Sequence, residues 1–263
     1  MKDIFLVSII QGITEFLPVS SSGHLQLISK LYHIPMVGRT TEVALHLGTV
    51  LVIFAYFWRD LMNMIEGLFS LLRGKILPGF WLLFFICLAT IPVVICGYMV
   101  DSYGDNLGRT LTFIGWASII SGVLLYVVDH NMPTTRRLDS LTIKDSLIIG
   151  VIQCIALVPG VSRLGSTLIA GRLLGFKRTE AARFSFLLSI PAILGAATLT
   201  FMRLTQHTAF PFSSTLFLAM AVAFVIGLFV LVLFMSWLRK FTLTPFAIYR
   251  IIFGLFVLYF AYF

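Results

Sequence analysis

Charged residues are scarce in this chain. Only 11% of its 263 residues are Asp, Glu, Lys or Arg, whereas an average soluble domain has about 25%. This shortage excludes an ordinary soluble globular protein. With 59% hydrophobic residues and a mean hydropathy of +1.01, the composition is that of an integral membrane protein. Its length allows roughly six to eight spans of about 20 residues each.

Cysteine and acidic residues are also few. Cys87, Cys96 and Cys154 lie in apolar stretches without paired spacing, which argues against a disulfide framework and against a cysteine metal site. The 11 acidic residues are outnumbered by 19 basic ones. Because the basic residues fall mostly in short loops, they indicate the positive-inside rule rather than binding to nucleic acid. Anionic lipid headgroups or an anionic substrate are the partners that suit such a surface.

Two polar stretches interrupt the apolar chain. They read QGITEFLPVSSSGH at residues 11–24 and PGVSRLGST at residues 159–167. Ionisable groups at membrane depth are costly and are kept mainly where they pair, line a cavity or do chemistry. Each stretch contains a proline, which disfavours a continuous helix. We therefore expect two broken helices. The apolar start lacks a small-residue cleavage site, so we expect it to be retained rather than removed as a signal peptide.

Six other apolar segments are long enough to span a membrane. They lie at residues 43–58, 80–100, 111–128, 181–201, 215–236 and 246–262. The basic loops between them are expected in the cytoplasm. These loops are residues 59–79, 129–145 and 237–244. The expected fold class is an all-α polytopic membrane protein with six transmembrane helices and two re-entrant helical hairpins.

The two halves of the sequence share short motifs in the same order. Val-Ser at residues 19–20 recurs at 161–162, and Thr-Glu at residues 41–42 recurs at 179–180. Each match is short, but their common order indicates an internal repeat. The charges of the loops place corresponding spans of the two halves in opposite directions, which predicts an inverted-topology repeat.

The repeat predicts where the polar stretches meet. Its halves are residues 1–128 and 146–263, joined by a cytoplasmic loop at 129–145. The re-entrant hairpins, 1–30 and 146–174, would enter from opposite faces of the membrane. Their tips would then meet near the midplane, where inverted-repeat proteins build their binding sites.

The tips carry complementary chemical groups. Arg163 presents a planar fork of N–H donors that suits phosphate oxygens. Glu15, Ser21 and His24 combine a carboxylate, a hydroxyl and an imidazole, the groups of an activated nucleophile or an acid–base pair. Together they indicate phosphoryl chemistry. We expect further contacts to the substrate from Gln11, Ser20, Ser22, Gly160, Ser162, Ser166 and Thr167.

Several of these side chains have a structural alternative. Ser20, Ser22 and Ser166 are equally suited to capping a helix or bonding backbone groups that a proline leaves free. Gln11 and Gln153 either bridge the two hairpins or are structural.

Other polar residues are interpreted as follows. His24 is alternatively an interior histidine with satisfied nitrogens. Edge or snorkelling positions are expected for Arg172, Arg183 and Arg250. A divalent cation, Mg²⁺ or Ca²⁺, near Glu15 would neutralise a diphosphate, but a single acid at the tip does not require one.

At these motifs the sequence resembles the undecaprenyl-diphosphate phosphatase family, the bacitracin-resistance type of bacterial membrane enzyme. The first family motif is met by Gln11, Glu15 and FLPVSSSGH, and the second by Pro159, Gly160, Ser162, Arg163 and Thr167. Leu164 departs from the second motif, which usually has serine there. The resemblance covers essentially the whole chain.

The resemblance implies an activity and a location. The expected reaction removes a phosphate from undecaprenyl diphosphate, which recycles the lipid carrier for cell-wall synthesis and confers bacitracin resistance. The expected location is the bacterial plasma (inner) membrane, with the active site opening to the outer, periplasmic side. The family pattern makes Glu15, Ser21, His24 and Arg163 the catalytic group.

The attacking group is left open by the sequence. Ser21, His24 or a water attacks phosphorus, and we expect Glu15 to orient His24 for proton transfer. The alternative function is a lipid-phosphate transporter or flippase, because broken helices that meet at the midplane also suit transport. A homodimer is left open by the sequence.

Overall fold

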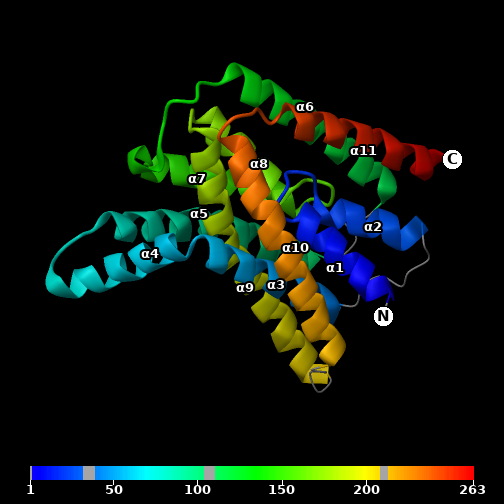
Figure 1. Ribbon diagram of the computed structural model, residues 1–263, viewed down its shortest axis with the longest axis horizontal. Helices are drawn as coiled ribbons and strands as arrows, with labels where there is room; N and C mark the ends of the chain where they lie inside the picture. The colour runs from blue at the N-terminus through cyan, green and yellow to red at the C-terminus, as the bar shows by residue number, and fades with distance from the viewer. Residues whose placement is uncertain (1, 32–38, 104–109, 208–212) are drawn as a thin grey trace.

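The computed structural model describes the chain apart from residues 1, 32–38, 104–109 and 208–212. The described part is helical and contains no strand, only one isolated bridge between Arg136 and Phe176. The helices, shown in Figure 1, are α1 (Lys2–Thr14), α2 (Ser21–Leu31), α3 (Arg39–Tyr56), α4 (Trp58–Ser70), α5 (Pro78–Tyr103), α6 (Leu111–Asn131), α7 (Ile143–Gln153), α8 (Arg163–Leu173), α9 (Arg178–His207), α10 (Ser214–Leu238) and α11 (Thr244–Tyr262). Short 3₁₀ helices lie at Leu71–Arg73, Leu138–Ser140 and Cys154–Leu157.

The long helices match the expected membrane spans. In the described residues, α5, α6, α9, α10 and α11 are each long and apolar enough to cross a membrane. The bent pair α3–α4 is a sixth candidate. Many large apolar side chains on these helices face outward, as hydrocarbon requires. The all-α polytopic membrane fold is therefore confirmed.

The loop expected at residues 59–79 is wrong, because most of it is helix. Helix α4 follows α3 after a bend of 79°, and it projects from the rest of the molecule together with the start of α5 (Figure 1). Exposed Met62, Ile65 and Phe69 recur at helical spacing along α4. Arg59 precedes Met62, and Glu66 lies between Ile65 and Phe69. The basic residues of this segment predict a loop, but an amphipathic helix carries basic residues equally well.

The helices pack in pairs. α1 lies against α10 and α7 lies against α5, while α3 contacts both α9 and α10. The closest pair is α6 and α11, which run in opposite directions. A Cβ atom at Gly254 would lie 2.6 Å from the carbonyl oxygen of Gly115, so both positions need glycine for the two backbones to meet.

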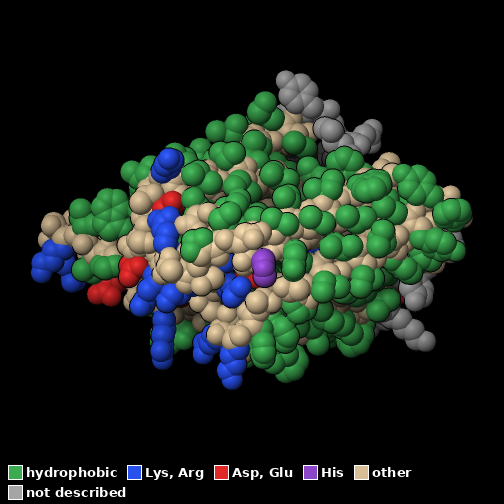
Figure 2. All heavy atoms as spheres, turned by 90° about the horizontal axis from the view of Figure 1, so that it is seen from above, with side chains coloured by type: hydrophobic (Ala, Val, Ile, Leu, Met, Phe, Trp, Pro, Cys, Tyr) green, Lys and Arg blue, Asp and Glu red, His purple; other side chains and the backbone are tan. Residues whose placement is uncertain are grey.

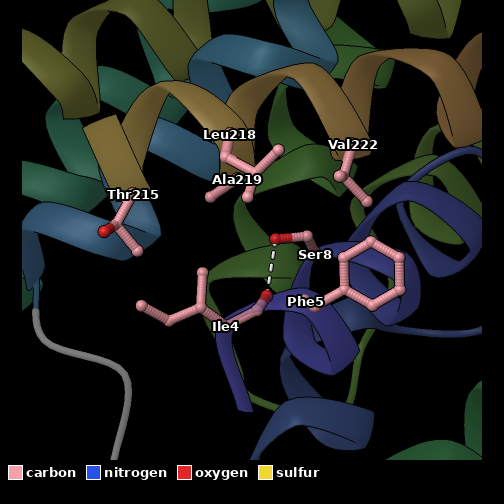
Figure 3. Close-up of a pocket in the computed structure, with 7 residues that line it drawn as sticks. All are labelled: Ile4, Phe5, Ser8, Thr215, Leu218, Ala219 and Val222. Carbon is pink, nitrogen blue, oxygen red and sulfur yellow. Dashed lines mark hydrogen bonds between the residues drawn. The ribbon is translucent and has the colours of Figure 1, made fainter. Parts of the chain in front are cut away.

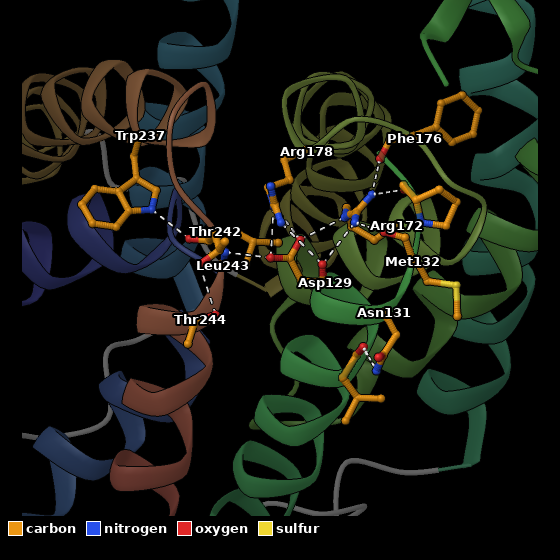
Figure 4. A network of polar contacts seen from close by, with 12 residues as sticks. Asp129, Asn131, Met132, Arg172, Phe176, Arg178, Trp237, Thr242, Leu243 and Thr244 are labelled. Atoms are coloured by element: carbon orange, nitrogen blue, oxygen red, sulfur yellow. Dashed lines mark hydrogen bonds and ion pairs between the residues drawn. The ribbon is translucent and has the colours of Figure 1, made fainter. Parts of the chain in front are cut away.

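A buried ionic network fixes one end of this pair (Figure 4). The Asp129 carboxylate, near the end of α6, accepts hydrogen bonds from Arg172 Nε at 2.9 Å and Arg178 Nε at 2.7 Å. It also accepts from the Leu243 N–H at 2.9 Å, just before α11. One carboxylate thereby connects α6, α8, α9 and the turn that leads into α11.

Arg172 is an interior residue, so the expected edge position is wrong. Its side chain is 0% exposed. Its guanidinium also donates to the carbonyl oxygens of Asp129, Met132, Pro133 and Phe176. A guanidinium has five N–H donors and no acceptor, so a ring of carbonyls and a carboxylate satisfies it without water. Arg183 forms an ion pair with Asp60 on α4.

Charge is unevenly distributed on the surface. Figure 2 shows Lys and Arg side chains gathered toward one end of the face in view, whereas hydrophobic side chains cover most of the remainder. This separation is expected of a protein that contacts hydrocarbon over most of its surface and headgroups or water at its ends.

Candidate active site

The first polar stretch forms a turn between α1 and α2. Helix α1 ends at Thr14, and Pro18, which has no N–H, follows in the turn. Ser20 has a φ of +72°, a left-handed conformation that is uncommon outside glycine. Residues held in such conformations cluster at functional sites. The break places Glu15 in the turn and Ser21 at the first position of α2.

The second polar stretch forms a turn between α7 and α8. Ser162 caps α8, because its Oγ accepts a hydrogen bond from the Gly165 N–H at 3.0 Å. Gly160 has a φ of +90°, and a Cβ atom there would lie 2.8 Å from the Ile114 carbonyl oxygen. Only glycine fits this turn against α6. Arg163 is therefore the first residue of α8, and the tight turn at Gly160 sets the direction in which this helix starts.

Arg250 of α11 connects the two turns. Its Nη1 donates to the Pro18 carbonyl at 3.1 Å, and its Nη2 donates to the Gly160 carbonyl at 3.1 Å and to the Ser121 hydroxyl. The side chain is fully buried. The expected edge position of Arg250 is wrong, because the turns supply carbonyl oxygens for both Nη atoms inside the protein, while Nε has no hydrogen-bond partner in the described part of the chain. The Gly160 carbonyl thus faces α11, so any contact between Gly160 and a substrate must come from its N–H.

Glu15 is the centre of the first group of polar contacts. Arg163 Nη2 lies 2.5 Å from Glu15 Oε1. The Ser21 hydroxyl donates to Glu15 Oε2 at 2.8 Å, and Gln11 Nε2 donates to the same oxygen at 3.1 Å. Glu15 is 8% exposed and Arg163 is 22% exposed. The two tips therefore meet as the sequence predicted, with a cation and a hydroxyl on one buried carboxylate.

His24 is the centre of a second group of contacts. Its Nδ1 lies 2.7 Å from the Ser20 carbonyl oxygen, and its Nε2 lies 2.7 Å from the Tyr249 hydroxyl. The Phe253 ring stacks on the imidazole with centroids 4.0 Å apart. The expectation that Glu15 orients His24 is wrong, because the backbone turn at Ser20 and the α11 side chains hold the ring instead.

The other predicted hydroxyls differ in what they can offer an anion. Ser166 and Thr167 both donate to the Arg163 carbonyl at 2.9 Å, so each would have to rotate before it could donate to a phosphate. Ser162 accepts from a backbone N–H, which leaves its own hydroxyl hydrogen able to donate outward. Ser20 and Ser22 lie 3.3 Å apart, Oγ to Oγ. Among these hydroxyls, the buried Ser162 and the exposed Ser22 donate to no backbone carbonyl of the described residues.

Three residues near the site were missed or left undecided by sequence reasoning. Tyr249 lies in an apolar span and matches neither polar motif, so no sequence signal marked it, and Arg250 in the same span was assigned to the membrane edge. Gln153 is 0% exposed, and neither of its side-chain amide atoms has a hydrogen-bond partner in the described part of the chain. A buried amide without partners is rare, and it makes Gln153 a candidate for contact with a water or a substrate.

The described residues contain no group of three or more His, Cys, Asp and Glu side chains placed to hold a metal ion. Glu15 is the carboxylate of the site, and it already binds Arg163, Ser21 and Gln11. A cation here would need most of its ligands from substrate phosphates, which is how Mg²⁺ is usually held. The side chains alone do not form a cation cage.

A hollow between α1 and α10 has a different chemistry (Figure 3). Its cavity volume is only about 10 Å³, and its lining is almost entirely apolar. The lining includes Ile4, Phe5, Leu218 and Val222. Ser8 also lines it, and its hydroxyl donates to the Ile4 carbonyl at 2.6 Å. Without a charged side chain, this hollow is unsuited to a diphosphate.

Known proteins resemble the chain over its full length. The family model described as bacitracin resistance protein BacA matches residues 4–256. Undecaprenyl-diphosphatase 1 of Rhodospirillum rubrum is 41% identical, over 100% of this chain and 95% of that protein. The undecaprenyl-diphosphatase of Roseobacter denitrificans is 39% identical over 98% of each chain, and that of Campylobacter curvus is 41% identical over 97% of each.

Proposed function

Because the chain belongs to the bacitracin resistance protein BacA family, we propose that it is a membrane phosphatase that hydrolyses undecaprenyl diphosphate to undecaprenyl phosphate and inorganic phosphate. The family model covers both polar motifs, so the family resemblance predicted from them is confirmed. Relatives named undecaprenyl-diphosphatase match nearly the whole chain. The reaction recycles a lipid carrier for cell-wall synthesis and, by restoring that carrier, confers resistance to bacitracin.

The main structural support for this proposal is that the Ser21 hydroxyl donates to the Glu15 carboxylate, which also pairs with Arg163. A serine that donates to a buried carboxylate is an activated nucleophile. A guanidinium beside it supplies donors for the phosphate that the nucleophile attacks. The three side chains come from two turns that are far apart in the sequence.

The geometry favours Ser21 over His24 as the attacking group. Both ring nitrogens of His24 already have hydrogen-bond partners, Ser20 on one side and Tyr249 on the other. Ser21 is partly exposed, and its proton already points at a base. The Ser21 oxygen forms a bond to the terminal phosphorus, its proton passes to Glu15, and the bond from phosphorus to the bridging oxygen breaks. Undecaprenyl phosphate leaves, and a phosphoserine remains for water to hydrolyse.

Arg163 has two successive partners in this mechanism. In the free protein it neutralises Glu15, which keeps a buried carboxylate from being an unpaired charge. A bound diphosphate competes for the guanidinium, because phosphate oxygens accept its N–H groups in the same geometry. As Arg163 turns toward the phosphate, Glu15 becomes free to take the Ser21 proton. Substrate binding thus activates the base.

The arrangement of the chain in the membrane follows from the repeat. We propose that residues 1–128 and 146–263 are inverted repeats with re-entrant hairpins at 1–30 and 146–174. In this repeat α1 corresponds to α7, and α5 corresponds to α10. The packing of α1 on α10 and of α7 on α5 supports the repeat, since each of these pairs is the counterpart of the other. The site then opens to the outer, periplasmic side of a bacterial plasma (inner) membrane. A homodimer stays a prediction.

A lipid-phosphate transporter or flippase is the less favoured function. Such a carrier needs an anion clamp, which Arg163 would supply. It has no need for a serine that donates its proton to a buried carboxylate. The relatives that match the full chain are named for diphosphatase activity.

The test is phosphate release by the purified protein in detergent with undecaprenyl diphosphate, where transport has no meaning. We expect Ser21→Ala and Arg163→Ala to lose at least about a hundredfold in rate, the scale of an activated nucleophile or a charge clamp. Ser8→Ala is the matched control, since its hydroxyl bonds within α1. Wild-type rates in both site variants would show that the site lies elsewhere. No release by the wild-type protein would overturn the proposed activity.

A further inference from the structure

Tyr249 is the residue of α11 that meets the first hairpin beside Arg250. Its hydroxyl oxygen lies 2.7 Å from Nε2 of His24. The two rings are nearly parallel, with an interplanar angle of 6° and centroids 5.7 Å apart. Tyr249 is 45% exposed, whereas His24 is only 9% exposed. The phenol therefore extends from a buried imidazole to the surface of the protein.

The direction of the hydrogen bonds follows from the Ser20 carbonyl. A carbonyl oxygen only accepts, so His24 Nδ1 must carry the hydrogen in the contact with Ser20. In a neutral imidazole, Nε2 then holds the lone pair. The Tyr249 hydroxyl must therefore donate to Nε2. Phe253, stacked on the imidazole, keeps the ring in this plane.

This arrangement leaves His24 without a free ring nitrogen. A proton can reach Nε2 only through the Tyr249 hydroxyl or by displacing it. The phenol oxygen keeps lone pairs that can accept a hydrogen bond while its own hydrogen stays on Nε2. Because Tyr249 is half-exposed, protein atoms do not enclose this oxygen.

The proposed reaction needs a second proton acceptor. After Ser21 attacks, Glu15 holds the serine proton and can no longer act as a base. Hydrolysis of the phosphoserine requires that a water lose a proton as it attacks phosphorus. His24 is held by contacts other than Glu15. Its Nε2 lone pair can therefore still take up a proton after Glu15 has been protonated.

We propose that Tyr249 is the proton relay between this water and His24, an inference that rests on the proposed phosphatase function. As the water oxygen bonds to phosphorus, its proton passes to the Tyr249 oxygen and the Tyr249 proton passes to Nε2. The bond between phosphorus and the Ser21 oxygen breaks, and that oxygen takes back its proton from Glu15. Inorganic phosphate leaves, His24 is protonated, and Tyr249 ends as a neutral phenol. His24 then releases its proton to solvent.

The test is Tyr249→Phe, which keeps the ring and removes the hydroxyl. We expect kcat for undecaprenyl diphosphate to fall roughly 10- to 100-fold, within the range of general acid–base effects, while kcat/KM stays within about twofold, because KM falls together with kcat when hydrolysis of the phosphoserine limits turnover. Substrate labelled in its terminal phosphate should leave label on Ser21 after an acid quench, because hydrolysis of the phosphoserine has become slow. Tyr262→Phe, an exposed tyrosine near the end of the same helix, should behave as the wild type.

The outcomes separate the relay from simple packing. A kcat for Tyr249→Phe within twofold of the wild-type value overturns the relay. A lower kcat without labelled Ser21 also overturns it, since the hydroxyl would then support only the shape of the site. Thermal unfolding of Tyr249→Phe at the wild-type temperature excludes misfolding as the cause. If the wild-type protein itself releases no phosphate, the proposed function fails rather than the relay.

Discussion

Arg163 and Glu15 are separated by 148 positions in the sequence, yet Nη2 of one lies 2.5 Å from Oε1 of the other. This ion pair joins the start of α8 to the turn after α1. It neutralises both charges in a mostly buried place and brings the predicted anion clamp beside the predicted base. The pair is the contact on which the proposed chemistry depends.

Arg163→Lys should reduce activity even though it keeps the charge. A guanidinium can hold a carboxylate or phosphate with two parallel N–H donors, whereas an ammonium acts as a point charge. We expect kcat/KM for undecaprenyl diphosphate to fall roughly 10- to 100-fold, about 1.4–2.8 kcal/mol in transition-state stabilisation. Steady-state phosphate release in detergent measures this. Arg239→Lys, at an exposed arginine after α10, is the control, and equal losses in both variants would contradict the prediction.

Arg250→Met should destabilise the protein by roughly 1–3 kcal/mol, the cost of one buried group left unsatisfied. The substitution leaves the Pro18 carbonyl without the donor it now has, whereas the Gly160 carbonyl keeps the Ser118 hydroxyl at 3.4 Å. Thermal or denaturant unfolding in detergent measures the change. Ser121→Ala removes another partner of Arg250 and should cost less, because the guanidinium keeps both carbonyls. An unchanged unfolding midpoint for Arg250→Met would show that the two turns hold together without it.

Asp129→Asn should lower stability more than activity. It removes the counter-charge of Arg172, which is 0% exposed, and an uncompensated buried charge costs about 3–5 kcal/mol. Asp129 lies eight positions beyond Ser121 on α6, about 12 Å along the helix. Folded enzyme should therefore keep kcat within roughly threefold of the wild-type value. Asp139→Asn, at an exposed position, is the matched control, and equal unfolding midpoints for the two variants would contradict the assignment.

The Asp145–Arg136 pair should make stability depend on acid pH. Burial raises the pKa of Asp145, but hydrogen bonds from Arg136 and Thr142 lower it more, so it lies below its ordinary value of 3.8. A carboxyl with a depressed pKa in the folded state adds stability that is present above 3.8 and is lost as the pH falls through the lower, folded-state value. Unfolding midpoints in detergent from pH 7 to pH 3 should fall more steeply for the wild type than for Asp145→Asn. Parallel curves would rule out this contribution.

The two polar sequence motifs predicted that the turns carrying Glu15, Ser21 and Arg163 meet, and these side chains are in contact. Glu15, Ser21 and Arg163 stood out because such groups rarely occur in apolar chains. Their meeting follows from two broken helices in opposite halves of the sequence. The partners of His24 did not follow, because Tyr249 lies 225 positions away in a span whose sequence is otherwise ordinary.

Buried arginines were the other failure of sequence reasoning. Arg172 and Arg250 look like snorkelling residues, since each lies within an apolar helix of limited length. Their burial depends on carbonyl oxygens that other segments leave unpaired at turns, such as those of Pro18 and Met132. A sequence does not show which backbone groups a distant turn will leave free, so it cannot tell a membrane-edge cation from an interior one.

The guanidinium of Arg250 also restricts how the molecule can move. Its N–H groups bond one carbonyl on each hairpin turn, so the distance between the turns is set by the size of a single planar group. Separating the turns would break the hydrogen bond of this guanidinium to at least one of the two carbonyls. The two turns are therefore linked through a single side chain, and any increase in the distance between them requires Arg250 to give up a hydrogen bond.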